Sequence, residues 1–419
     1  AELISRYDEI GWQIRKVAEE VIAEPKLATP AEVATAIAPR RPVRVARTVA
    51  DTGDRAAGQG AAARSLVFGG RLPEQAGPLT LAQTVNAALT DALLTNPGML
   101  VYGQDVGRKG GLHGITRHLQ ERFGTDRVFD TGADETSVLG LALGGALSGL
   151  LPVPEIQYLA QLHHAEVQLR GEAVTLSFRS GGALRNPMVV RVAGLAYQQS
   201  LGGHAANDNA VAVLRDVPGL VVAVPARAAE AAALLRSCLT SAAVDGSVCV
   251  FLEPIALYHT RDLYRPGDGE WLAPYAGPGD WAAEHAPIGR ARTYPVASAA
   301  DLTILTYGNG VRMSLRVAAD LATEGYGSRV VDLRWLNPLP VADLLREASA
   351  TSRVLIVDET RRSGGVGEGV LAALVDGGYV GAVRRIASAD SFIPLGPAAQ
   401  QVLIGEDAIT QGARALLAG

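Results

Sequence analysis

The chain has 419 residues, of which 48% are hydrophobic and 19% charged, so it has ample material for a large buried core and for two or three domains. Its net charge of −5 argues against nucleic acid or an anionic membrane as the main partner. The only two cysteines, Cys238 and Cys249, predict neither a disulfide framework nor a cysteine-based zinc site, and a cytoplasmic location fits best.

Residues 1–38 are expected to form a helical tail. Apolar residues recur there at steps of three and four and predict an amphipathic helix over residues 1–23: Leu3, Tyr7, Ile10, Ile14, Val17 and Val21. Thr29, Pro30 and Glu32 then supply a cap, a proline at the first helical position and an acid at the third. A second, short helix is therefore expected to follow.

Residues 39–78 are expected to be a linker, because the regular apolar pattern disappears into Arg, Ala, Gly and Pro. Six arginines and two aspartates between residues 39 and 64 give this stretch a local charge of +4. It is either an arm for nucleic acid or a solvated linker that lies on an acidic neighbour. The absence of interleaved aromatic residues favours the linker.

From residue 79 onward, short apolar runs alternate with helical patterns, which predicts an α/β fold with two doubly wound, mostly parallel sheets. The first domain is expected over residues 79–257 and the second over residues 291–419, with a connection rich in Pro, Gly and Trp over residues 258–290. The predicted strands include MLVYG, RVFD, PVPEIQYL, PMVVRVAG, LVVAVPA and SVCVFLEP, then LTILTYG, RVVDLRWL, RVLIVDE and AVRRIASA. Helices are predicted near residues 80–95, 114–123, 160–178, 208–215 and 227–243.

An uncharged run of 19 residues lies between Glu135 and Glu155 and barely reaches the length of a membrane span. Its glycines, serines and two prolines instead predict a buried helix, a tight turn and a buried strand. The sequence therefore predicts no membrane association. Two GxxxG pairs in this run indicate close helix packing at a subunit interface: Gly140, Gly144, Gly145 and Gly149.

Two glycine-rich motifs are candidates for a phosphate or metal site. Gly267–Asp268–Gly269 resembles the start of the magnesium–diphosphate motif of thiamine enzymes, but no asparagine occurs between Asn209 and Asn309 to complete it. It is therefore predicted to be a turn, and no metal site is expected in this chain. The segment SGGVGEGV at residues 363–370 is able to accept a phosphate at a helix N-terminus, although close packing is favoured.

Glu135 is the leading candidate for a catalytic acid, since it follows VFDTGAD and precedes the uncharged run. It is either a helix cap or a carboxyl with a raised pKa that exchanges a proton with a bound heterocycle. Three histidines are expected to lie in nearby segments. His163 and His164 belong to a predicted helix, whereas His204 lies in the loop GGHAAND, which is expected to open onto a cleft.

A series of motifs occurs in the order of one family: LVYGQDVGRKGG, RVFDTGADE, GLLPVPEIQ, FRSGG, DVPGLVVAVPA, VFLEP, LTILTYG, VVDLRWLNPL and VDETRRSGGVGE. Over residues 79–419 the chain resembles the β subunit of the thiamine-diphosphate-dependent decarboxylating component of 2-oxoacid dehydrogenase complexes. The resemblance implies a pyrimidine-binding domain followed by a transketolase C-terminal domain. The first 40 residues resemble instead the end of an α subunit, as in forms in which the two subunits are fused.

The resemblance also implies an active site shared between two chains. Glu135 would hydrogen-bond N1′ of the aminopyrimidine, which favours the imino tautomer whose N4′ removes the thiazolium C2 proton. Gln157, Gln161 and Ala133 fall at positions of the pyrimidine pocket. The α subunit would bind the diphosphate and Mg²⁺, in an α2β2 assembly that docks on a lipoyl acyltransferase core.

Three positions depart from the family pattern. Gln104 replaces an acid, and Gln161 replaces an aromatic residue that stacks on the aminopyrimidine. The acid/base histidine of the family falls on His204 when counted from PMVVRV, but on Ala206 when counted from DVPG. Three functions therefore stay open: a 2-oxoacid dehydrogenase subunit, a transketolase- or acyloin-type carboligase, and a catalytically weakened subunit that supports its partner.

Overall fold

The structure is a computed structural model that describes residues 2–37, 41–197 and 203–419, without the side chains of Asp54 and His204. The chain divides into two units, Ala1–Ala38 and Pro39–Gly419. The first unit contains α1 (Glu2–Ala23) and α2 (Pro30–Ala34). The predicted cap of α2 is confirmed, because Thr29 Oγ1 accepts from the Glu32 amide at 3.2 Å and the Glu32 carboxylate accepts from the Ala28 amide.

The second unit begins with a seven-stranded sheet in the order β10-β5-β6-β4-β3-β1-β2. Neighbouring strands are parallel except for β10, which pairs with β5 in the antiparallel sense. The strands are β1 (Met99–Gly103), β2 (Val128–Asp130), β3 (Leu151–Ile156), β4 (Met188–Gly194), β5 (Val221–Ala223), β6 (Val248–Pro254) and β10 (Trp335–Asn337). The six strands predicted before residue 257 are thus confirmed.

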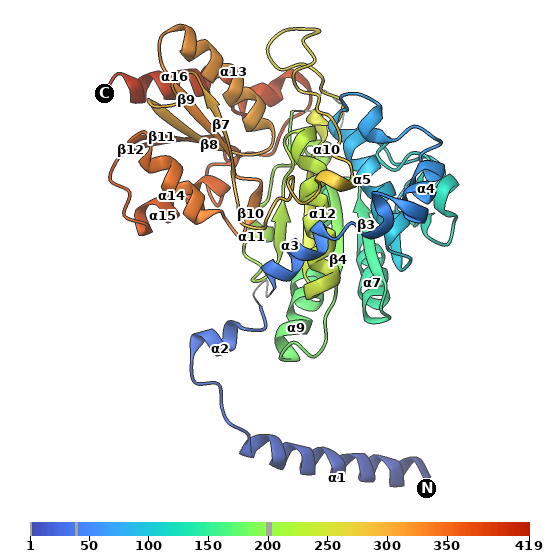
Figure 1. Ribbon diagram of the computed structural model, residues 1–419. Coiled ribbons are helices and arrows are strands. Elements are labelled where there is room, and N and C mark those ends of the chain that lie inside the picture. The colour runs from blue at the N-terminus through green and yellow to red at the C-terminus, as the bar shows by residue number, and fades with distance from the viewer. Residues whose placement is uncertain (1, 38–40, 198–202) are drawn as a thin grey trace. The chain divides into compact units, whose positions relative to one another are not determined.

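Both faces of this sheet are buried. Along β4, Val189 faces one apolar cluster while Val190 and Val192 face the other, as expected for a parallel strand between two helical layers. The first face is covered by α5 (Leu81–Thr95) and α12 (Ala228–Asp245), and α7 (Glu135–Leu147) packs on the second (Figure 1). The shorter helices are α6 (Leu119–Phe123), α8 (Leu159–Leu162), α9 (Thr175–Arg179), α10 (Gly203–Asn207) and α11 (Ala212–Arg215).

The helix predicted over residues 160–178 is interrupted. After α8 the chain forms a 3₁₀ turn at His163–Ala165 and a π-helical stretch at Gln168–Val174, and regular α-helix returns only in α9. Gly171 lies in the middle of the π stretch, and its carbonyl accepts a hydrogen bond from Thr175 Oγ1 at 2.5 Å. A glycine and a side-chain donor that takes a helical carbonyl both weaken regular α-helix.

A second sheet of five strands has the order β12-β11-β8-β9-β7, in which only the edge strand β7 is antiparallel to its neighbour. Its strands are β7 (Arg292–Val296), β8 (Leu302–Thr306), β9 (Ser328–Asp332), β11 (Arg353–Arg361) and β12 (Ala382–Ser388). The helices are α13 (Asn309–Thr323), α14 (Val341–Ser349), α15 (Val366–Asp376) and α16 (Glu406–Leu417). The sequence predicted neither β7 nor β10, and β10 extends the first sheet from the C-terminal half of the chain.

The expected linker over residues 39–78 is largely helical, with α3 (Pro42–Ala50) and α4 (Gly58–Val67). Val45 and Val49 of α3 are buried, and α3 packs against α12. Arg64 of α4 is also buried and binds the carboxylates of Glu74 and Asp91. The acidic neighbour predicted for this basic stretch therefore exists, but the contact is buried, which is why the charge pattern alone resembles a solvated linker.

The uncharged run after Glu135 forms α7 and β3, and no helix among the described residues is long and apolar enough to cross a membrane.

The predicted turn at Gly267–Gly269 is confirmed. Its Asp268 carboxylate accepts four backbone N–H groups, from Leu263, Tyr264, Arg265 and Glu270, which hold the pKa of that carboxyl well below its usual range. At the start of α15, the Gly367 amide donates to the Asp358 carboxylate at 2.6 Å, so the chain's own acid takes the place of a phosphate.

Candidate functional site

The candidate residues gather at one edge of the seven-stranded sheet. Because β1, β2, β3 and β4 are parallel, the segments that follow them leave the sheet at the same edge. These segments carry Gln104 after β1, Glu135 after β2 and Gln157 after β3. In parallel α/β sheets this edge is where ligands bind.

Glu135 is the first residue of α7, but it does not cap the helix. Asp134 is the N-cap, and its carboxylate accepts hydrogen bonds from the backbone amide and the hydroxyl of Ser137. The Glu135 side chain is 13% exposed, and His164 Nδ1 lies 3.8 Å from its Oε2. Thr136 Oγ1 also donates to the His164 carbonyl at 3.3 Å. The carboxyl of Glu135 is therefore held at a helix N-terminus, and its oxygens are not used by the backbone cap.

Gln157 connects two of the loops at this edge. Its Nε2 donates to the Gln104 carbonyl at 3.1 Å and lies 3.5 Å from a carboxylate oxygen of Asp105. Asp105 has a positive φ of 62° and also binds Lys109 at 2.7 Å, a hydrogen bond that lowers its pKa. Gln157 thus fixes the loop after β1 in place.

A cavity of about 490 Å³ lies near these residues, and we call it the Gln161 cavity; His164 lines it, whereas Glu135 and Gln157 do not. Its lining combines residues in and around α8, residues of α10 and the segment that follows it, and one residue of the C-terminal half: Tyr158, Ala160, Gln161, His163, His164, Ala205, Ala206, Asp208 and Phe392. The Gln161 Oε1 atom is buried and has no hydrogen-bond partner among the described residues. A buried acceptor without a donor is costly, so this atom suits a ligand that brings one.

Three charged residues from distant parts of the chain form a row along this cavity. His163 Nε2 lies 3.2 Å from one carboxylate oxygen of Asp208, and Arg361 Nη2 donates to the other at 3.0 Å. Asp208 is buried, which raises its pKa, but the hydrogen bond from His163 and the charge of Arg361 outweigh burial, so the pKa of Asp208 is lowered. The ionised Asp208 therefore orients the His163 ring and ties the edge of the first sheet to β11.

The other predicted site residues are placed as follows. Ala133 lies exposed in the loop between β2 and α7, and it does not line the Gln161 cavity. Ala206, one of the two positions for the family histidine, is buried in α10 and lines the cavity. His204 also belongs to α10, but its side chain lies outside the described part of the structure.

No group of three or more His, Cys, Asp or Glu side chains among the described residues is arranged to hold a metal ion. The two cysteines are buried and unpaired by disulfide.

The protein thus has two doubly wound sheets, with an acid at the N-terminus of α7 near a cavity at the strand edge. The profile for "Transketolase, pyrimidine binding domain" matches residues 78–259, and that for "Transketolase, C-terminal domain" matches residues 292–409. The pyruvate dehydrogenase E1 component subunit beta of Staphylococcus epidermidis is 32% identical over 344 residues, which cover 81% of this chain and 98% of that protein. Its counterpart in Staphylococcus aureus is 31% identical over the same shares.

The chain therefore belongs to the family of transketolase-like β subunits that includes the β subunit of the pyruvate dehydrogenase E1 component. A solved structure described as "Split gene transketolase, inactive beta4 tetramer" has the same fold, with a TM-score of 0.60 over 81% of this chain and 99% of that one. Its sequence identity is 20%, so this likeness concerns the fold alone.

Proposed function

We propose that this chain is the β-type subunit of a thiamine-diphosphate-dependent 2-oxoacid dehydrogenase, and that it supplies the pyrimidine half of an active site shared with an α-type partner. The observation that carries the proposal is Glu135. Its carboxyl is largely buried at the start of α7, Asp134 has taken over the capping role, and His164, which lies 3.8 Å from the carboxylate, lines the Gln161 cavity.

The residues at this edge fit the pyrimidine half of the cofactor. The Gln161 cavity has the size of a ligand site, and the unpartnered Oε1 of Gln161 is able to accept from an exocyclic amine. Glu135 would hold a proton against the ring nitrogen N1′, and Gln157 would keep the loop after β1 in position. When bound, thiamine diphosphate would supply the carbon nucleophile and the electron sink for decarboxylation.

His163 is our proposed acid/base group for this protein. The family histidine falls on His204 or Ala206, and Ala206 has no ionisable side chain. His163 lines the same cavity, and Asp208 and Arg361 hold it in a single orientation. When a fixed carboxylate binds one ring nitrogen of a histidine, the ring is oriented so that the other nitrogen is able to give or accept a proton.

The diphosphate and Mg²⁺ would be bound by the α-type partner, since the described residues of this chain offer no metal cluster and its glycine motif at Gly267–Gly269 is a turn.

Two such αβ pairs would meet through α7. At Gly140 and Gly144 no atom of the described chain lies within 4 Å of where a Cβ would stand, and Leu141 and Leu147 are exposed beside them. This open apolar face is available for a second copy. A lipoyl acyltransferase core would receive the acyl group.

Reconstitution with an α-type partner tests the reaction type. The assembly would be incubated with thiamine diphosphate, Mg²⁺, a panel of 2-oxo acids and a separate lipoyl domain, and CO2 release and acylated lipoyl lysine would be measured. We expect both products in equal amounts. Formation of an acyloin or a ketose without acylation of the lipoyl domain would favour a carboligase, and no product with any substrate would favour a supporting subunit.

A further inference from the structure

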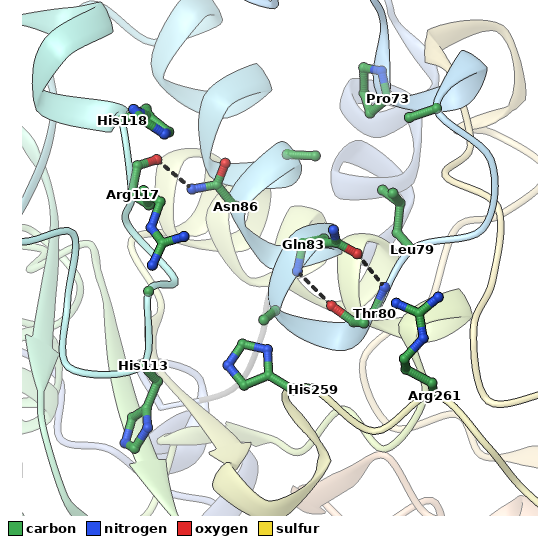
Figure 2. A pocket seen from close by; sticks show the side chains of 14 residues that line it. Pro73, Leu79, Thr80, Gln83, Asn86, His113, Arg117, His118, His259 and Arg261 are labelled. Atoms are coloured by element: carbon green, nitrogen blue, oxygen red, sulfur yellow. Dashed lines mark hydrogen bonds between the residues drawn. The ribbon is translucent and has the colours of Figure 1, made fainter. Parts of the chain in front are cut away.

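A second cavity, of about 640 Å³, is lined by His113, whose ring contacts that of Tyr158 in the lining of the Gln161 cavity. We call it the α5 cavity, because its lining surrounds the first two turns of that helix (Figure 2). Its wall comes from three stretches of chain: residues 73–87, residues 113–118 and residues 259–261. The proposed function uses none of these residues.

The permanent charges in the lining of the α5 cavity are the two arginines, Arg117 and Arg261. Two arginines and three histidines line it, and none of the described residues in its lining is Asp or Glu: Arg117, Arg261, His113, His118 and His259. This is unusual for a chain with a net charge of −5. Within the described part of the chain, neither Arg117 nor Arg261 forms a salt bridge with a carboxylate.

The acids nearest in sequence are already engaged elsewhere. Glu74 binds Arg64, and Asp262 accepts from the backbone amides of Gly267 and Gly269. Glu121 binds His118 Nδ1 at 3.0 Å at the exposed rim. Asp262 also interacts through its charge with Arg261, whereas Arg117 has no carboxylate partner within the described residues. The charge of Arg117 is therefore the one that an anion in the cavity would neutralise.

Hydrogen-bonding groups and an apolar floor accompany these cations. The Nε2 atom of His113 is buried and unpartnered within the described residues, and burial together with the nearby charge of His259 lowers the pKa of His113. Asn86 holds the loop in place by donating to the carbonyls of Ile115 and Arg117. The floor is formed by small apolar side chains: Pro73, Ala76, Leu79, Ala82 and Ala87.

We propose that the α5 cavity binds a small organic anion, a phosphate ester or a carboxylate with an apolar body. Arg117 and Arg261 would contact the anionic head, and the alanine and leucine side chains would contact the body. The volume lies within the range of about 300–1,000 Å³ typical of small-molecule sites. The ring of His113 meets the ring of Tyr158 edge-on, with centroids 6.1 Å apart. Because His113 lines the α5 cavity and Tyr158 lines the Gln161 cavity, these two rings connect the walls of the two cavities.

Isothermal titration of the full chain tests the proposal with three probes of similar size: phenyl phosphate, benzoate and the neutral benzyl alcohol. We expect saturable binding of one molecule of phenyl phosphate or benzoate per chain, with the tighter of the two naming the head group, and no binding of the alcohol. The double variant Arg117→Gln/Arg261→Gln should bind at least about 10-fold more weakly, because two charge-assisted contacts are lost.

The matched control is Arg179→Gln/Arg384→Gln, which removes two exposed arginines outside the cavity and should leave the affinity unchanged. Saturable binding of neither anion would overturn the proposal, as would equal weakening in the control variant or equal binding of benzyl alcohol. Because the readout is binding to the chain alone, it is independent of whether the proposed thiamine chemistry is right.

Discussion

Arg64 offers the sharpest test of how the chain before residue 79 is built into the fold. Its guanidinium is 2% exposed, and it donates four hydrogen bonds, two to Glu74 and two to Asp91, at 2.6–3.2 Å. Replacing Arg64 by Met keeps most of the apolar stem but leaves Asp91, which is 4% exposed, with the Tyr275 hydroxyl as its remaining side-chain donor. Removing one partner of a buried ion pair costs about 3–5 kcal/mol, because the other charge stays buried.

Urea unfolding followed by tryptophan fluorescence measures this cost. We expect Arg64→Met to lower the free energy of unfolding by about 3–5 kcal/mol. The matched control is Arg44→Met on α3, an exposed arginine in the same basic stretch, which should change the free energy by less than about 0.5 kcal/mol. Equal, small effects of the two substitutions would refute the conclusion that residues 41–78 belong to the folded body.

Three further predictions concern single side chains. Burial raises the pKa of Asp332 to about 7, so the unfolded chain loses this proton at lower pH than the folded one, and stability should fall as pH rises from about 4 to 7. Asp332→Asn should remove this fall, on the order of 4 kcal/mol, in urea titrations at several pH values. His163→Gln should lower kcat of the αβ assembly by about 10²–10⁴, whereas Asp208→Asn, which leaves the imidazole in place, should give a smaller loss. Gln161→Leu should weaken thiamine diphosphate binding to the αβ assembly about 3- to 10-fold in calorimetry, because the acceptor for the exocyclic amine is lost.

Most of the fold was predictable because most of the strands are short apolar runs buried on both faces; the edge strand β12 is the clearest exception. All ten predicted strands form, at positions that the runs themselves mark. The strand β10 was missed because its first two residues belong to the apolar run RVVDLRWL, which the sequence predicts as a single strand. Its pairing with β5 also joins positions more than a hundred residues apart. The helix expected near residues 114–123 shrinks to α6, since Gly110, Gly111 and Gly114 adopt positive φ values in the loop before it.

The site was predictable only where one residue carries the signal. Glu135 stands out because a long uncharged run follows it, and the structure adds that Asp134 relieves it of the capping role. The row of His163, Asp208 and Arg361 could not be foreseen, because its members are 45 and 153 residues apart and each is an ordinary polar residue in its own segment. The same is true of Arg64 and Asp91, whose pairing depends on how α4 packs against α5.

The central claim is that Glu135 takes part in proton exchange with the pyrimidine ring. Decarboxylation of a 2-oxo acid by the reconstituted αβ assembly, measured with an artificial electron acceptor, tests it most directly. Glu135→Gln should reduce the rate by about 10²–10⁴, because an amide keeps the shape but cannot exchange the proton, while Glu172→Gln at an exposed position should leave it unchanged. An undiminished rate in Glu135→Gln would contradict the claim.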